Sequence, residues 1–198
     1  MRLILLRHGE TIDNTKGIIQ GHLPGKLNEN GILQAQKAAL RLSKEKIDIL
    51  YSSDLYRAVE TAAEVLKILP KLQAEYTEEL RELNMGVNQG KTKEELNWQN
   101  EFKGIYIPPE GGESTEDLYE RIEKFLHYIA EKHQNKTVLC VSHGGTIKAF
   151  ISVLTGVDKS QVFAVQNIKN TSISIFEILD NLQNKVVLLN DVSHLEKK

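Results

Sequence analysis

The sequence predicts an α/β fold, a three-layer α/β/α sandwich whose central sheet is mostly parallel with some antiparallel pairing. Short apolar segments of strand length alternate with longer amphipathic segments along most of the 198-residue chain. Near the C-terminus two strand-like segments follow one another without a helix between them, which favours antiparallel pairing. A hydrophobic content of 40% is enough for one sizeable core, so we expect residues 1–198 to form a single domain.

The first part of the chain contains two strands, each followed by a helix. The apolar run at 3–6 predicts a strand that is buried on both faces and stops at a charged cluster. Apolar residues spaced three and four apart predict an amphipathic helix over 28–43. The run at 47–51 predicts a second strand, and the Ser-Ser-Asp sequence at 52–54 offers N-caps for a helix that ends near Leu69.

The middle of the chain has weaker patterns. Residues 76–83 are compatible with a short edge strand, and residues 92–102 with a helix. Proline and glycine residues at 108–112 then interrupt the chain. Ser114 follows as a candidate N-cap, and the two acidic residues at 116 and 117 suit the positive end of a helix that ends near Lys132.

The last third of the chain resembles the first in its alternation. Its expected elements are a buried strand at 137–141, a helix at 146–154, and strands at 172–179 and 185–189. The turn-prone residues 180–181 are expected to join the last two strands, and residues 196–198 are expected to fray.

The composition limits the partners. A formal net charge of −2 argues against attraction to nucleic acid or to an anionic membrane, because both select basic surfaces. Cys140 is the single cysteine and lies in an apolar run, so we expect a reduced core residue rather than a nucleophile. No apolar run reaches the ~18–20 residues of a membrane span, and no signal-peptide pattern follows Met1. These features predict a cytoplasmic protein.

Two of the predicted strands end in a histidine followed by glycine. Ligands of open parallel sheets bind at the carboxyl ends of the strands, so His8 and His143 are expected in one crevice. The glycines allow close approach of the backbone, and the helix that follows each strand offers free amide groups to an anion. Arg7 and Arg57 add planar donors that suit phosphate oxygens. The sequence therefore predicts a pocket for a phosphate dianion.

A neutral imidazole in such a pocket is a competent nucleophile near neutral pH, because its unperturbed pKa is ~6.5. It would form a phosphoramidate that water later hydrolyses, while the leaving alkoxide requires a proton. The residue pattern alone leaves four candidates for the proton donor, namely Glu78, Glu79, Glu82 and Glu113.

Four motifs between residues 3 and 154 resemble, in order, those of the histidine phosphatase superfamily, phosphoglycerate-mutase-like branch, of the broad-specificity phosphatase type. They are Leu-Arg-His-Gly-Glu-Thr at 6–11, Ser-Asp-Leu-Tyr-Arg-Ala-Val-Glu-Thr-Ala at 53–62, Leu-Arg-Glu-Leu at 80–83 and Val-Ser-His-Gly-Gly at 141–145. The resemblance implies a phosphoglycerate-mutase-like fold that acts on a small-molecule phosphate ester.

The resemblance also implies residue roles. His8 would be the phosphorylated nucleophile and Glu82 the proton donor, while Arg7, Arg57 and His143 would hold the phosphate. The residues expected to line the substrate pocket are Asn14, Gln20, Gly21 and Gly144. We expect no cofactor and no metal.

One stretch departs from the family pattern. Many members carry a phenylalanine and a tryptophan where this chain has Met85 and Asn88, although the glycines at 86 and 90 are kept. This wall of the pocket is therefore expected to differ from that of the family. The remaining histidines are expected to be structural or exposed, namely His22, His127, His133 and His194.

Three other functions are compatible with parts of this pattern. A cofactor-dependent phosphoglycerate-type mutase uses the same histidine, but the resembling mutases have added segments over the pocket, whereas about thirty residues separate Glu82 from Gly112 here. A non-catalytic phospholigand-binding module should have lost its nucleophile or its acid. A zinc site formed by His8, His22 and His143 would lack a close-spaced pair of ligands. We therefore expect a phosphomonoester hydrolase.

Overall fold

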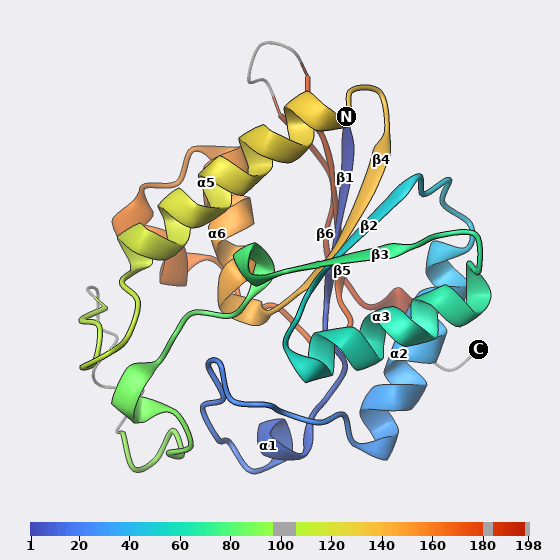
Figure 1. Ribbon diagram of the computed structural model, residues 1–198. Coiled ribbons are helices and arrows are strands. Elements are labelled where there is room, and N and C mark those ends of the chain that lie inside the picture. The colour runs from blue at the N-terminus through green and yellow to red at the C-terminus, as the bar shows by residue number, and fades with distance from the viewer. Residues whose placement is uncertain (97–105, 180–183, 197–198) are drawn as a thin grey trace.

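The computed structural model describes residues 1–96, 106–179 and 184–196. A six-stranded sheet with the order β3-β2-β4-β1-β5-β6 lies between two layers of helices (Figure 1). The predicted three-layer α/β/α architecture is confirmed.

The sheet combines a parallel part and an antiparallel part. The parallel strands are β1 (Arg2–Arg7), β2 (Ile49–Ser53), β3 (Ala74–Thr77) and β4 (Thr137–Ser142). The antiparallel strands are β5 (Ile173–Glu177), which pairs with β1, and β6 (Lys185–Asp191), which pairs with β5. The expected mixture of mostly parallel and some antiparallel pairing is confirmed.

The helices cover both faces of the sheet. The α-helices are α1 (Ile12–Thr15), α2 (Glu29–Leu42), α3 (Tyr56–Ile68), α5 (Thr115–Lys132) and α6 (Gly144–Thr155). Short 3₁₀ helices are η1 (Glu78–Leu80), η2 (Gly86–Asn88), η3 (Lys159–Ala164) and η4 (Ser193–Leu195). Figure 1 shows α2 and α3 on one face and α5 and α6 on the other.

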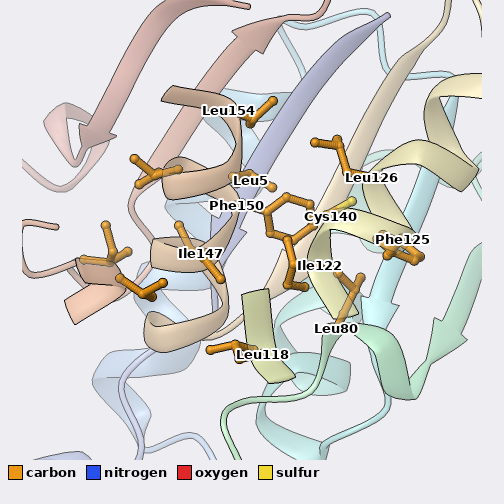
Figure 2. Packing of buried hydrophobic residues seen from close by; sticks show 14 of the residues in the cluster. Leu5, Leu80, Leu118, Ile122, Phe125, Leu126, Cys140, Ile147, Phe150 and Leu154 are labelled. Carbon is orange, nitrogen blue, oxygen red and sulfur yellow. The ribbon is translucent and has the colours of Figure 1, made fainter. Parts of the chain in front are cut away.

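The two faces of β1 belong to two apolar cores, because successive side chains of a strand point to opposite sides. Leu3 and Leu5 pack in the core beneath α5 and α6, while Ile4 and Leu6 pack in the core beneath α2 and α3. Figure 2 shows Leu5 beside Cys140 in the first of these cores. Cys140 is fully buried, and burial raises the pKa of its thiol, so its expected place in the core is confirmed.

Helix boundaries agree with the sequence where a side chain caps the helix. Asn28 accepts a hydrogen bond from the Gly31 N–H at the start of α2, and Ser114 forms a capping box with Asp117 at the start of α5. Residues 52–54 do not cap α3 as expected, because Leu55 is the N-cap and has no side-chain cap bond.

Three other expectations need correction. The edge strand is shorter than 76–83, because the chain turns into η1 after Thr77. Helix α6 begins at Gly144 rather than at 146, since a single residue connects it to β4. Within the expected helix 92–102, residues 92–96 form a β-bridge and a turn, and residues 97–102 lie outside the described part. The expected turn at 180–181 and residues 197–198 also lie outside it.

Candidate active site

The sheet brings His8 and His143 together across 135 residues of sequence. The parallel register pairs Arg7 of β1 with Ser142 of β4, so the two histidines leave the sheet at the same level. The His8 N–H donates a hydrogen bond to the Ser142 carbonyl oxygen at 2.9 Å, and the two imidazole centroids are 5.2 Å apart. His8 is 2% exposed and His143 is fully buried.

The hydrogen bonds of His8 select one tautomer. Its Nδ1 lies 2.7 Å from the carbonyl oxygen of Gly9, which only accepts hydrogen bonds, so Nδ1 carries the proton. The lone pair therefore lies on Nε2. Burial, followed by the charges of Arg57 and Arg7, holds the pKa of His8 well below its ordinary value, against a smaller effect of the Gly9 bond. The ring is neutral, with an unprotonated Nε2.

His143 has protein partners on both nitrogens. Arg57 Nε donates to its Nδ1 at 3.1 Å, so the proton of the ring lies on Nε2. That nitrogen donates to Ser53 Oγ at 2.8 Å, and Ser53 ends the neighbouring strand β2. Burial, followed by the charge of Arg57, lowers the pKa of His143 well below its ordinary value.

Two guanidinium groups border the histidines. Arg57, in the first turn of α3, is 1% exposed and donates to the carbonyl oxygens of Leu23 at 3.0 Å and Gly21 at 2.8 Å. Arg7 donates to the Ile168 carbonyl at 2.6 Å, and its buried Nε has no hydrogen-bond partner among the described residues. Within the described residues no carboxylate lies within 4.0 Å of either guanidinium. Burial lowers the pKa of Arg57 to about 10, and the charges of Glu82 and Asp13 offset this shift only in part.

Glu82 lies at the N-terminus of α6. Its Oε1 accepts hydrogen bonds from the amides of Leu83 at 2.9 Å and Thr146 at 3.2 Å, and its Oε2 from the Gly145 amide at 3.1 Å. A Cβ atom at Gly145 would lie 2.5 Å from Glu82 Oε1, so a larger residue at this position would displace the Glu82 carboxylate. The amide of Gly144, the first helical residue, donates to no group of the described chain and remains open to an anion.

The structure separates Glu82 from the other glutamates that the sequence left as candidates. Arg121 binds both carboxylate oxygens of Glu113 at 2.9 Å. Glu78 pairs with Arg81 at 3.1 Å, and Glu79 is exposed. Of the four candidates, only Glu82 adds a favourable charge interaction to both Arg7 and Arg57.

The expected pocket residues join this site through hydrogen bonds. Asn14 Oδ1 accepts from the Thr11 amide at 3.1 Å and from Asn170 Nδ2 at 3.3 Å, and Asn170 also donates to the His8 carbonyl at 3.1 Å. Gln20 Nε2 donates to Thr11 Oγ1 at 2.9 Å, whereas its buried Oε1 has no partner in the described part of the chain.

Sequence reasoning missed several contributors. Ser53 belongs to the second motif and ends a strand, and this position could have marked it as a site residue. Asn170 precedes β5, whose start lies beside the end of β1 because the two strands are antiparallel. His22, expected to be structural or exposed, lies with its Nε2 2.7 Å from the Glu82 carbonyl oxygen and supports the backbone of that residue. No motif marks His22 or Asn170.

The described residues lack two other features. They contain no group of three or more His, Cys, Asp or Glu side chains placed to hold a metal ion. None of their helices is long and apolar enough to cross a membrane.

The two histidines and Arg7 at the carboxyl edge of the sheet, with Arg57 from α3, form a site suited to a phosphate dianion, as the sequence predicted. The family model of the histidine phosphatase superfamily (branch 1) matches residues 3–192. The chain therefore belongs to that superfamily, and the expected phosphoglycerate-mutase-like fold is confirmed.

Three relatives illustrate this membership. The chain is 37% identical to phosphoglycerate mutase-like protein 4 of Arabidopsis thaliana, over 98% of this chain and 87% of that protein. It is 33% identical to phosphoserine phosphatase 1 of Hydrogenobacter thermophilus, over 98% and 94% of the two chains. The solved structure of a mutant phosphoserine phosphatase from Entamoeba histolytica in complex with phosphoserine matches with a TM-score of 0.86 at 32% identity, over 98% and 99%.

Proposed function

We propose that this protein hydrolyses phosphate monoesters of small metabolites by transferring the phosphoryl group to Nε2 of His8 and then to water. The observation that carries this proposal is the bond between His8 Nδ1 and the Gly9 carbonyl, because it leaves the lone pair on Nε2. This lone pair lies among two arginines that have no carboxylate partner within the described chain. The site thus combines a neutral nucleophile with charges suited to a dianion.

In the first step Nε2 of His8 attacks phosphorus, and the bond from phosphorus to the ester oxygen breaks. Glu82 donates a proton to that oxygen, so the product leaves as an alcohol. Arg7, Arg57 and the open amide of Gly144 stabilise the charge on the phosphoryl oxygens. The Gly9 carbonyl, which accepts from Nδ1, stabilises the positive charge that the imidazole gains on phosphorylation.

In the second step a water molecule attacks the phosphorus of phosphohistidine. Glu82, now ionised, accepts the proton of that water, and the bond between phosphorus and Nε2 breaks. Inorganic phosphate and neutral His8 are the products. The same carboxylate thus returns to its protonated form for the next cycle.

His143 acts in this proposal through Arg57. Both of its ring nitrogens bind protein groups, so its contribution is to orient the guanidinium that holds the phosphate. Two hydrogen bonds therefore connect Ser53 at the end of β2, His143 after β4 and Arg57 of α3.

The phosphatase names of the Hydrogenobacter and Entamoeba relatives support hydrolysis of a small phosphorylated metabolite. A mutase reaction would pass through the same phosphohistidine but would return the phosphoryl group to the bound intermediate. Incubation with 3-phosphoglycerate and with a panel of other metabolite esters separates the two reactions. We expect free phosphate to exceed isomerised product, and the reverse result would establish a mutase.

The phosphoenzyme provides the direct test. After a quench in alkaline denaturant with substrate radiolabelled in its phosphate, we expect protein-bound label with the alkali stability and acid lability of phosphohistidine. His8→Ala should abolish this label, and His127→Ala, at an exposed histidine of α5, should retain it. Label that persists in a folded His8→Ala variant would contradict the proposal.

A further inference from the structure

Lys148 shares a helical face with the two glycines that open α6. Residues three and four apart lie on the same face of a helix, and helical side chains lean toward its N-terminus. A Cβ atom at Gly144 would lie 3.6 Å from Arg7 Nε, and one at Gly145 would lie 2.5 Å from Glu82 Oε1. The Lys148 side chain therefore extends along the side of α6 that faces the phosphate site.

Lys148 is a partly buried cation without a counter-ion in the described chain. Its Nζ donates to the Phe163 carbonyl oxygen of η3 at 3.3 Å and lies 5.7 Å from the centroid of the Phe163 ring. No carboxylate of residues 1–96, 106–179 or 184–196 lies within 4.0 Å of this Nζ. One of its three N–H groups is used, and two are available.

Lys148 interacts electrostatically with two residues of the candidate site, Glu82 and Arg7. Burial lowers the pKa of its ammonium, Glu82 opposes this shift, and Arg7 adds to it. Lys159, on the neighbouring η3, has a different environment, since it is exposed and pairs with Glu120 at 3.6 Å. Like Arg7 and Arg57, Lys148 is thus a cation beside the site that has no carboxylate partner in the described chain.

We propose that Lys148 determines specificity by binding a carboxylate on the alcohol part of the substrate. This inference rests on the proposed function, in which Arg7 and Arg57 compensate the two charges of the phosphate. A second anionic group of the same ester is then the partner that Lys148 lacks. A single ammonium with two available N–H groups suits a monoanion with two oxygens better than a second phosphate dianion.

Matched esters test this role. O-Phosphoserine and phosphoethanolamine share the phosphate and the amine but differ in the carboxylate, and 3-phosphoglycerate and glycerol 3-phosphate form a second pair. We expect Lys148→Met to lower kcat/KM about tenfold to hundredfold for the carboxylate esters, mainly through KM, because it removes a charged hydrogen bond. The two carboxylate-free esters should change less than about threefold. Lys148→Arg should restore part of the loss.

The matched control is Lys159→Met, which should leave kcat/KM unchanged for all four esters. Equal losses for both members of each pair would overturn the proposal, because Lys148 would then support α6 and η3 or the catalytic charges. Unchanged kinetics in a folded Lys148→Met variant would also overturn it.

Binding distinguishes a failure of this inference from a failure of the proposed function. Calorimetry with the His8→Ala variant measures affinity for phosphoserine and phosphoethanolamine without turnover. A preference for phosphoserine that disappears in the His8→Ala/Lys148→Met double variant supports the role of Lys148 even if no ester is hydrolysed. Equal affinity for the two esters in His8→Ala overturns it.

Discussion

His8 and His143 follow neighbouring parallel strands at the same level, and both are buried, yet their hydrogen bonds differ. His8 binds a backbone carbonyl through Nδ1 and keeps the lone pair of Nε2. His143 accepts from Arg57 at one nitrogen and donates to Ser53 at the other. The same residue type at equivalent strand ends thus keeps a lone pair for the proposed nucleophilic attack in one case and supports a cation in the other, because the partner atoms differ.

Alanine substitution of each histidine tests this difference most directly. His8→Ala should reduce turnover to the detection limit, since no nucleophile remains. His143→Ala should retain turnover with kcat/KM lowered about tenfold to hundredfold, because an unsatisfied buried Arg57 N–H costs about 1–3 kcal/mol. Phosphate release, with circular dichroism to verify folding, measures both. Losses of the same size would show that His143 takes part in the chemistry itself.

Glu82→Gln tests where the leaving group obtains its proton, since neither nitrogen of His143 is free to supply it. We expect the single-turnover burst of leaving group to fall roughly 10²–10⁴-fold for an alkyl phosphate, the usual contribution of general acid catalysis. The burst from p-nitrophenyl phosphate should stay nearly normal, because a stabilised phenoxide needs little protonation.

Isolating the burst is necessary because the proposed mechanism also uses Glu82 in dephosphorylation. Equal losses for the alkyl and the aryl ester would assign Glu82 to binding or to pocket geometry. The proton donor would then have to be another group, such as His143 after loss of its bond to Ser53.

Arg57→Ala removes the cation that donates to His143 and whose charge helps to lower the pKa of His8. We expect kcat/KM to fall about 10²–10³-fold, as when a preorganised donor to developing charge is lost. Arg41→Ala serves as the control and should retain activity. Arg41 lies in the last turn of α2, and its guanidinium pairs with Glu45. A loss of less than about tenfold for Arg57→Ala would mean that Arg57 does not touch the phosphate.

Ser53→Ala removes the acceptor for His143 Nε2–H, and also the acceptor for the Leu55 N–H at 3.2 Å. The expected loss is about 1 kcal/mol of transition-state stabilisation, or several-fold in kcat/KM, because the His143 ring keeps its bond from Arg57. Ser43→Ala, at an exposed serine after α2, should leave kcat/KM unchanged. An effect as large as that of Arg57→Ala would place Ser53 at the phosphate.

The last expected effect concerns the pH dependence of stability and leaves the activity aside. Both imidazoles have pKa values well below the ordinary value in the folded protein, whereas those of the unfolded chain are near ~6.5. As the pH falls below ~6.5, the unfolded state binds protons that the folded state excludes. The free energy of unfolding should therefore decrease by about 1.4 kcal/mol per pH unit for each histidine until its folded pKa is reached, and this contribution is constant above ~6.5.

Urea unfolding of wild type and His143→Gln between about pH 5 and 6.5 measures this slope. The variant should lose the contribution of one histidine, and His127→Gln, at an exposed position, should keep the wild-type slope. Identical slopes for wild type and His143→Gln would show that His143 is protonated in the folded protein over this range.

Elements whose signals are local could be predicted from the sequence. An apolar run of strand length followed by His-Gly marks the ends of β1 and β4, and Asn28 and Ser114 mark helix starts, because strand burial and capping depend on neighbouring residues. These patterns also predicted the α/β class and an anion pocket at one edge of the sheet. The motif order led to the family.

The contacts between site residues became visible only in the tertiary structure. It separated Glu82 from Glu78, Glu79 and Glu113, and it brought Ser53, Asn170 and Lys148 to the site. These contacts join residues that are far apart in the chain, and they depend on the strand order β2-β4-β1-β5 and on its register. No local pattern specifies such a contact, because it arises from long-range pairing of strands, and the choice of partner atoms then decides the proton position on each imidazole.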